Sequence, residues 1–190
     1  MSKIAISPGA TGDAVFTIQA PSTNTSRTLV LPDNAGTVLT SASNLAGVTG
    51  VGKVLQVVNA LLSTQVLSTT TTFADTGLTA SITPTSASSK ILVLVNHNGV
   101  GKQGGDTRVR IRLLRNSTDI LLIDNNAGYT ANSNFNRVGS SSTSFLDSPT
   151  TTSSVTYKTQ FSLADGSGTV GLSFDSSRST ITLMEIAAGL

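Results

Sequence analysis

Near the middle of the sequence lies the run Ile91-Leu92-Val93-Leu94-Val95, which is apolar at every position. A short continuous apolar run of this kind is typical of a central strand that is covered on both faces. Further along, residues 155–161 (Val-Thr-Tyr-Lys-Thr-Gln-Phe) alternate between apolar and polar side chains. Because successive side chains of a strand point to opposite faces, this segment predicts a strand with one face in water.

Apolar bursts of strand length recur on both sides of this run, separated by Gly, Pro, Asn and Ser residues that favour turns. No segment shows a convincing helical period. Eight to ten short strands in about 140 residues predict an all-β fold, a β-sandwich of jelly-roll type. The expected strands cover residues 54–58, 72–75, 78–82, 91–95, 108–114, 120–123, 144–146, 155–163, 169–174 and 180–186.

The composition supports β structure and excludes several kinds of chemistry. Ser and Thr make up 56 of the 190 residues, whereas Glu occurs once and Lys five times, so strong helix formers are scarce. The absence of Cys excludes disulfides and thiolate chemistry, and a single His excludes a metal site with several histidines in one chain. We expect no cofactor. The net charge of +2 does not imply binding to nucleic acid.

The chain divides into three parts by composition. Residues 1–45 contain short apolar bursts, but only 13 of the first 50 residues are large apolar ones, too few for a core of their own. Residues 46–52 are small and Gly-rich and predict a linker. Residues 53–190 have a denser succession of apolar, strand-length segments and form the expected head domain. We expect neither a signal peptide nor insertion into a membrane, because no long apolar segment occurs.

Residues 24–39 (Asn-Thr-Ser-Arg-Thr-Leu-Val-Leu-Pro-Asp-Asn-Ala-Gly-Thr-Val-Leu) resemble a module near the N-termini of bacteriophage fibre proteins, which feeds an extended β-shaft. The second region resembles the trimeric, tumour-necrosis-factor-like jelly-roll heads of phage tail fibres, especially those of marine phages. The segments that carry this likeness are 82–93 (Ile-Thr-Pro-Thr-Ser-Ala-Ser-Ser-Lys-Ile-Leu-Val), 154–160 (Ser-Val-Thr-Tyr-Lys-Thr-Gln) and 179–187 (Ser-Thr-Ile-Thr-Leu-Met-Glu-Ile-Ala).

The resemblance implies a homotrimeric, non-enzymatic virion protein that is made in the cytoplasm of the bacterial host. We expect a tail fibre whose head contacts a receptor on the bacterial surface, with a surface glycan as a possible ligand. Residues 1–45 would bind another virion protein, from the tail, the baseplate or the major capsid shell, and the candidates for this contact are Phe16, Ile18, Leu29 and Leu31. The alternatives are a trimeric capsid decoration protein or head fibre, and a cellular carbohydrate-binding module.

Three arginines alternate with apolar residues in the segment Arg108-Val109-Arg110-Ile111-Arg112-Leu113. In a strand, Arg108, Arg110 and Arg112 would share one face and repel each other unless anions lie nearby. One interpretation pairs them with Asp106, Asp119 or Asp124, or with carboxylates of a neighbouring chain. The other makes them a stripe that binds anionic surface sugars or another virion protein. DNA binding is disfavoured, because no aromatic residues interleave for base stacking.

The longest loop-like segment covers residues 125–137. Its amide side chains suit sugar hydroxyls and its tyrosine could stack on a sugar ring, so the receptor-binding candidates are Tyr129, Asn132, Asn134 and Arg137. The alternative is a solvated loop with Phe135 tucked beneath it. Residues 99–106, which include four glycines, are a second candidate for a mobile loop.

No pattern in the sequence supports catalysis or a metal site. Residues 47–53 match part of a phosphate-binding loop, but Val54 stands where that motif needs Ser or Thr. His97 follows the apolar run, where we expect it to end the strand as a structural residue or at a trimer axis. No G-x-S-x-G elbow and no calcium-binding loop motif occur. The ten carboxylates leave a glycosidase pair open by composition, but the chain is short for such an enzyme.

Overall fold

The all-β prediction is confirmed by a computed structural model, which describes residues 53–131 and 135–188. Within these residues there is no α-helix, and one short 3-10 turn, η2, covers Phe174–Ser176. The predicted boundaries at 45 and 52 lie outside the described residues. The strands are β1 (Val54–Leu62), β2 (Val66–Ser68), β3 (Ala74–Ile82), β4 (Lys90–Gln103), β5 (Val109–Arg115), β6 (Thr118–Ala127), β7 (Phe135–Asp147), β8 (Val155–Leu163), β9 (Val170–Leu172) and β10 (Ser179–Ile186).

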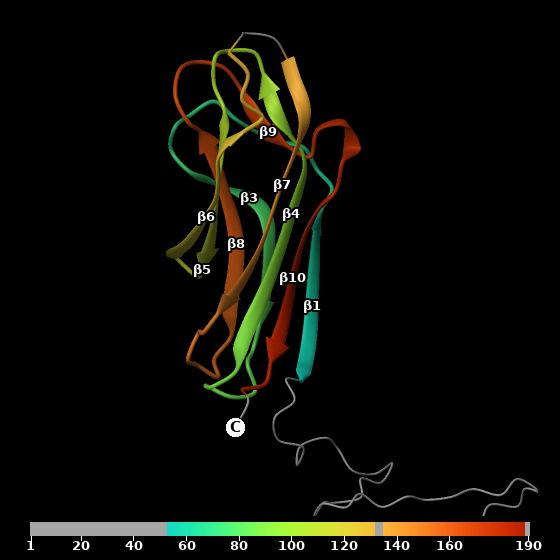
Figure 1. The fold of residues 1–190 in the computed structure, drawn as a ribbon, viewed down its shortest axis with the longest axis vertical. Coiled ribbons are helices and arrows are strands. Elements are labelled where there is room, and N and C mark those ends of the chain that lie inside the picture. The colour runs from blue at the N-terminus through green and yellow to red at the C-terminus, as the bar shows by residue number, and fades with distance from the viewer. Residues whose placement is uncertain (1–52, 132–134, 189–190) are drawn as a thin grey trace, which may run out of the picture. The chain divides into compact units, whose positions relative to one another are not determined.

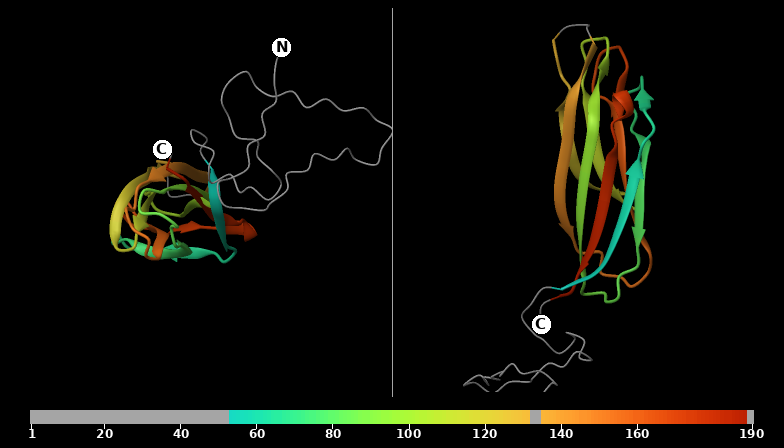
Figure 2. Two further views of the ribbon diagram at one scale, coloured as in Figure 1. Left: turned by 90° about the horizontal axis from the view of Figure 1, so that it is seen from below. Right: turned by 90° about the vertical axis from the view of Figure 1, so that its right-hand side faces the viewer.

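The strands form two sheets that pack face to face (Figure 1). The larger sheet has the order β1-β10-β4-β9-β2, and β7 pairs with the other edge of β4; its four long strands lie side by side in Figure 2. The smaller sheet has the order β3-β8-β5-β6. Among the long strands, the first pairs with the last and the second with the last but one, which is the order of a jelly roll.

Strand β4 is the central strand of the larger sheet. It pairs with β10 and β7 along its first half, and Gly101 and Lys102 pair with β9. The prediction that His97 ends this strand was wrong, because β4 continues to Gln103. The loop expected at 99–106 therefore begins only at residue 104. Gly101 permits this continuation, since a Cβ atom there would collide with the backbone oxygen of Asn136 in β7.

Two other predictions about strands and loops need correction. Residues 72–75 and 78–82 are not separate strands: β3 runs continuously from Ala74 to Ile82, with an irregular register around Gly77, whose φ is 86°. Residues 125–127 belong to β6 and residues 135–137 to β7, so the segment 125–137 is not one long loop. The polar sequence concealed these extensions, because strand pairing uses backbone hydrogen bonds that Asn and Gly provide as well as Val does.

The core lies between the sheets. Val155, Tyr157 and Phe161 of β8 are buried, whereas Lys158 and Gln160 are partly exposed, which confirms the wet face predicted for this strand. In β4, the alternate residues Ile91, Val93 and Val95 are buried in the core. Their neighbours Leu92 and Leu94 point to the outer face and are only half-buried, so within a single chain this strand is not covered on both faces.

Asp147 links the two sheets at the end of the core where β7 ends. It is 7% exposed and accepts a hydrogen bond of 2.7 Å from the hydroxyl of Tyr157 in the smaller sheet. Arg115, also from the smaller sheet, lies 3.0 Å from both carboxylate oxygens. Burial, together with the bond to Asp147, raises the pKa of Tyr157 far above its ordinary value of 10.0. The Tyr157 hydroxyl therefore stays protonated and donates throughout the physiological range.

The substitution Tyr157→Phe removes this hydroxyl and leaves the shape of the core unchanged. We expect the free energy of unfolding to fall by about 1–2 kcal/mol, because Asp147 loses a buried donor while Arg115 remains. Chemical denaturation measures this change. The matched control is Tyr129→Phe, which alters an exposed tyrosine and should leave stability unchanged. Equal stability of Tyr157→Phe and the wild type would contradict the proposed link.

Candidate functional site

The outer face of the smaller sheet carries charges that are paired within the chain. Arg112 Nη1 lies 3.0 Å from Asp119 Oδ2, and its Nε and Nη2 donate to Gln160 Oε1 over 3.0 and 2.6 Å. Lys158 Nζ lies 2.8 Å from Asp75 Oδ2. The hydrogen bonds from Lys158 and from Gln160 lower the pKa of Asp75. This face is therefore a hydrated surface whose charges are largely balanced.

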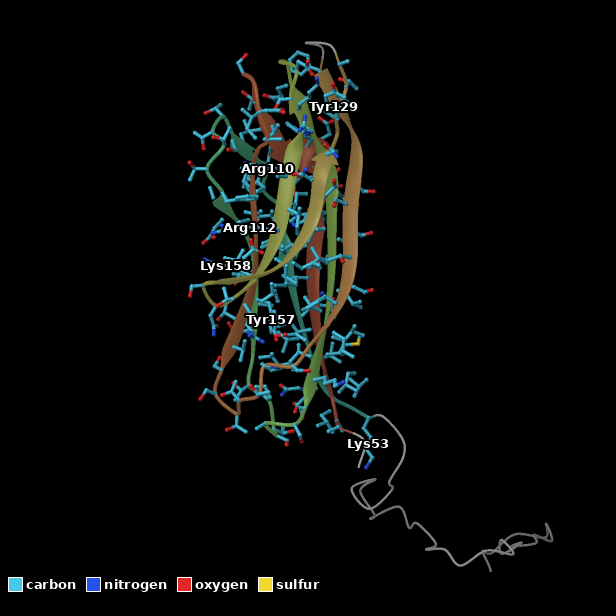
Figure 3. All side chains as sticks on the ribbon, turned by 60° about the vertical axis from the view of Figure 1, so that its left-hand side comes forward. Lys53, Arg110, Arg112, Tyr129, Tyr157 and Lys158 are labelled. Atoms are coloured by element: carbon cyan, nitrogen blue, oxygen red, sulfur yellow. The ribbon has the colours of Figure 1, made fainter. Side chains whose placement is uncertain are left out.

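The arginines of the predicted stripe form hydrogen bonds and ring contacts with other residues of the same chain. Arg110 donates to Ser162 Oγ over 3.1 Å and to the backbone oxygen of Thr71 over 2.8 Å. The guanidinium groups of Arg110 and Arg112 lie 4.9 and 4.1 Å from the centre of the Phe73 ring. Figure 3 shows Arg110, Arg112 and Lys158 in succession along one side of the sandwich.

Arg108 lies just before β5 and has other partners. Its Nη1 is 2.9 Å from Asp165 Oδ2, and its guanidinium lies 5.8 Å from the centre of the Tyr129 ring. Of the carboxylates that the sequence offered as partners, Asp119 is confirmed, for Arg112. Arg108 pairs with Asp165 instead, which lies far away in sequence but adjacent in the fold. Binding of an anionic partner by these arginines stays a prediction.

The outer face of the larger sheet has a different character. Three rows of side chains cross its four long strands, and each row takes one residue from β1, β10, β4 and β7 in that order. None of the residues in these rows is charged. The rows are Val57, Met184, Leu92 and Leu146; Asn59, Thr182, Leu94 and Ser144; and Leu61, Thr180, Asn96 and Ser142. We call this set of residues the uncharged face.

Half of the residues of the uncharged face are apolar, and three of these six are exposed. Val57 is 56% exposed, Leu61 49% and Leu146 49%. Among the polar members, Asn59 Nδ2 donates to Thr182 Oγ1 over 2.8 Å. Exposed apolar patches on a sheet mark contact surfaces. The sequence held one signal of this face, the outward leucines at 92 and 94, but only the pairing of strands collects the other residues around them.

The receptor-binding candidates lie in part at one end of the sandwich, where β4 ends and β7 begins; we call this end the apex. Tyr129 is exposed and sits next to Arg108. Arg137 lies in β7, with its Nη1 3.2 Å from Asp175 Oδ1 and its guanidinium 5.2 Å from the centre of the Phe135 ring. Phe135 is 68% exposed, so the alternative in which it is tucked under a loop is wrong.

Lys102, which no sequence pattern singled out, holds two connections at the apex. Its side chain is fully buried, and Nζ donates to the backbone oxygens of Gly105 over 2.7 Å and of Thr130 over 2.6 Å. It thereby fastens the β4–β5 connection and the β6–β7 connection to the end of β4. A lysine among glycines is typical of an exposed loop, so no pattern of residues indicated that Lys102 is buried.

His97 is a structural residue of the core. It is fully buried, points from β4 towards the smaller sheet, and has Nε2 3.0 Å from Thr159 Oγ1 in β8. Thr159 Oγ1 in turn lies 2.7 Å from Thr76 Oγ1 in β3. Burial lowers the pKa of His97 from 6.5 to about 4. Its position inside the core, and not on the outer face, removes the alternative of a histidine at a trimer axis.

Several predicted residues lie outside the described part of the chain and stay predictions. They are Phe16, Ile18, Leu29, Leu31, Asn132, Asn134 and the Gly-rich linker 46–52. Among the described residues, no group of three or more His, Cys, Asp or Glu side chains is placed to hold a metal ion. The same residues include no helix long and apolar enough to cross a membrane.

Comparison with known proteins adds no family to this description. No protein-family model matches the chain, and no curated protein matches it.

The buried, neutral state of His97 makes stability depend on pH. An unfolded chain takes up a proton at His97 below pH 6.5, whereas the folded protein does so only near pH 4. The stability that neutral His97 contributes is thus present above pH 6.5 and is lost as the pH falls, by about 3 kcal/mol in total. Chemical denaturation across this window should show a smaller loss for His97→Gln, because glutamine does not titrate.

The wild type and His97→Gln share all carboxylates, so acid titration of those groups cancels in the comparison. An equal loss of stability in both proteins between pH 6.5 and about 4 would show that His97 is not the group responsible.

Proposed function

We propose that the protein is a non-enzymatic structural protein of a bacteriophage virion, a trimeric tail fibre whose jelly-roll head contacts a receptor on the bacterial surface. The resemblance of residues 24–39 and of three head segments to phage fibres supports the family. The observation that carries the assembly is the uncharged face, which covers the outer side of the β1-β10-β4-β7 sheet up to the exposed Lys90 at the start of β4. Copies of the chain would pack through this face around a closed symmetry axis.

The contrast between the two outer faces supports this choice of contact surface. Burial of charged groups between chains requires the removal of their water, which costs free energy unless each ion is paired again. The uncharged face has none to bury, and its aliphatic side chains gain roughly 25 cal/mol for each Å² removed from water. The charged face of the smaller sheet would lose hydration in the same position, so we expect it to remain outside.

The free edge of β1 supports the same arrangement. Within the larger sheet β1 pairs with β10 alone, and its nine residues from Val54 to Leu62 carry no charge. A long uncharged edge strand invites pairing with any other chain, and natural proteins cover or charge such edges. In an assembly through the uncharged face, a neighbouring copy shields this edge.

The position of Lys53 at the end of the sandwich away from the apex supports a contact role for the apex. Lys53, where the described chain begins, lies at the end of the sandwich opposite to Tyr129 (Figure 3). A fibre attached through residues 1–45 would therefore present the apex to its surroundings. With three copies per head and several heads per particle, many weak contacts together would give strong attachment through avidity.

The oligomeric state tests this proposal directly. Light scattering of the purified full chain should give three times the chain mass of 19.4 kDa. Leu146→Asp places a carboxylate in the uncharged face and should shift the mass to that of one chain. Leu122→Asp is the matched control, since Leu122 is 54% exposed on β6 of the other sheet, and it should remain trimeric. A monomeric wild type, or equal behaviour of the two variants, would contradict the proposal.

Immunogold labelling of phage particles that carry the protein tests the place in the virion. Signal confined to the tail agrees with a tail fibre. Signal over the capsid would replace that role by capsid decoration, and absence of the protein from particles would leave the cellular carbohydrate-binding module.

A further inference from the structure

The exposed aromatic rings of the described residues gather at the apex. Of the seven aromatic residues described, five are buried or half-buried, and only Tyr129 and Phe135 are exposed, by 47% and 68%. These two residues flank the same connection, between β6 and β7. An aromatic ring left in water forgoes the free energy of burial, so two such rings at one end indicate a surface that is covered by a ligand.

Each of these rings is supported on one side by an arginine. The guanidinium of Arg108 lies 5.8 Å from the centre of the Tyr129 ring, and that of Arg137 lies 5.2 Å from the centre of the Phe135 ring. Such contacts are attractive because a cation faces the negative π-cloud of the ring. They restrain the ring while its remaining surface stays open to solvent. The two rings are thus restrained, and each leaves part of its surface exposed for contact.

The charges around the rings are already balanced. Arg108 pairs with Asp165 over 2.9 Å, and Arg137 pairs with Asp175 over 3.2 Å. An anionic ligand would have to compete with these carboxylates for the arginines, and a cationic ligand would have to compete with the arginines for the carboxylates. The geometry therefore favours an uncharged ligand.

The backbone beneath Tyr129 is fixed on both sides. Lys102 Nζ holds the backbone oxygen of Thr130, and Asn136 Nδ2 donates to the backbone oxygen of Gly128 over 3.1 Å. Gly128 has a φ of 67°, and a Cβ atom there would lie 3.0 Å from the Cα of Gly101. A recognition residue held in this way loses little conformational freedom on binding, which favours affinity.

The surroundings of the rings suit a sugar better than an apolar protein surface. Of the other exposed large hydrophobic side chains of the described residues, Leu67 of β2 belongs to a strand that pairs with β9 beside the end of β4, and the rest lie on β1, on β6 and at Leu146 of β7. The connections at the apex consist instead of small and polar residues, such as Gly104, Gly105, Thr130 and Ser167. Backbone and hydroxyl groups of this kind can donate to and accept from sugar hydroxyls, while the C–H face of a pyranose ring meets the negative face of an aromatic ring.

We propose that the apex binds a neutral sugar residue of a bacterial surface polysaccharide, with Tyr129 and Phe135 as stacking platforms. This inference rests on the proposed function, because it gives the receptor of the fibre a chemical class. Arg108 and Arg137 act as positioning residues that restrain the rings. A single site of this kind is shallow, and three copies in one head supply the avidity that attachment needs.

An array of immobilised bacterial polysaccharides, neutral and acidic, tests the proposal with the full chain as the probe. We expect binding to at least one neutral polysaccharide. Tyr129→Ala and Phe135→Ala should each weaken that binding about tenfold or more, since each removes one platform. Leu122→Ala is the matched control, because it truncates a side chain of similar exposure far from the apex and should bind as the wild type does. Thermal melting confirms that the variants are folded.

Three results would overturn the inference: no polysaccharide is bound, only acidic ones are bound, or the alanine variants bind as tightly as the wild type. Attachment to bacterial cells that is abolished by protease treatment would identify a protein receptor and would overturn it as well. Light scattering of the same samples distinguishes failure of the sugar-binding inference from failure of the proposed function. A trimer that fails on the array leaves the fibre proposal standing, whereas a monomer contradicts the fibre proposal itself.

Discussion

The pairing of β4 with three other strands is the constraint on which the rest of the structure depends. Its first half joins β10 and β7, and its second half joins β9 and the start of β7. The small residues Gly99 and Gly101 allow this long strand to pass close to its neighbours, because a side chain at either position would collide with backbone atoms. As a result one strand contributes to two surfaces. It supplies Leu92 and Leu94 to the uncharged face, and its Lys102 holds the connections at the apex in place.

Buried polar groups, more than ions, connect the two sheets. The chain from His97 through Thr159 to Thr76 crosses the core, and Asp147 joins Tyr157 at the far end. Glu185, the single glutamate, is buried and accepts hydrogen bonds from Gln56 and from Thr85. Although burial opposes its ionisation, these hydrogen bonds lower the pKa of Glu185. Such groups favour one packing of the sheets, since any shift of register leaves them without partners.

The two outer faces and the apex give the sandwich three distinct surfaces. The smaller sheet presents paired charges to water, and the larger sheet presents aliphatic, hydroxyl and amide groups. The apex presents two restrained aromatic rings whose neighbouring charges are balanced. The proposed assembly uses all three, with the uncharged face between copies, the charged face outside, and the apex free for a ligand.

The sequence by itself determined the all-β class, the jelly-roll architecture and the alternation of β8, because these depend on composition and on the period of two within a strand. It also offered Tyr129 and Arg137 as receptor-binding candidates, which the structure places at the apex. It missed the length of β4 and β7, the burial of Lys102 and the exposure of Phe135. These depend on which strands lie side by side, and backbone pairing leaves little trace in side chains such as Asn, Ser and Gly. Only the tertiary structure decided which side chains form the uncharged face, because that face combines residues from four strands that are distant in the chain.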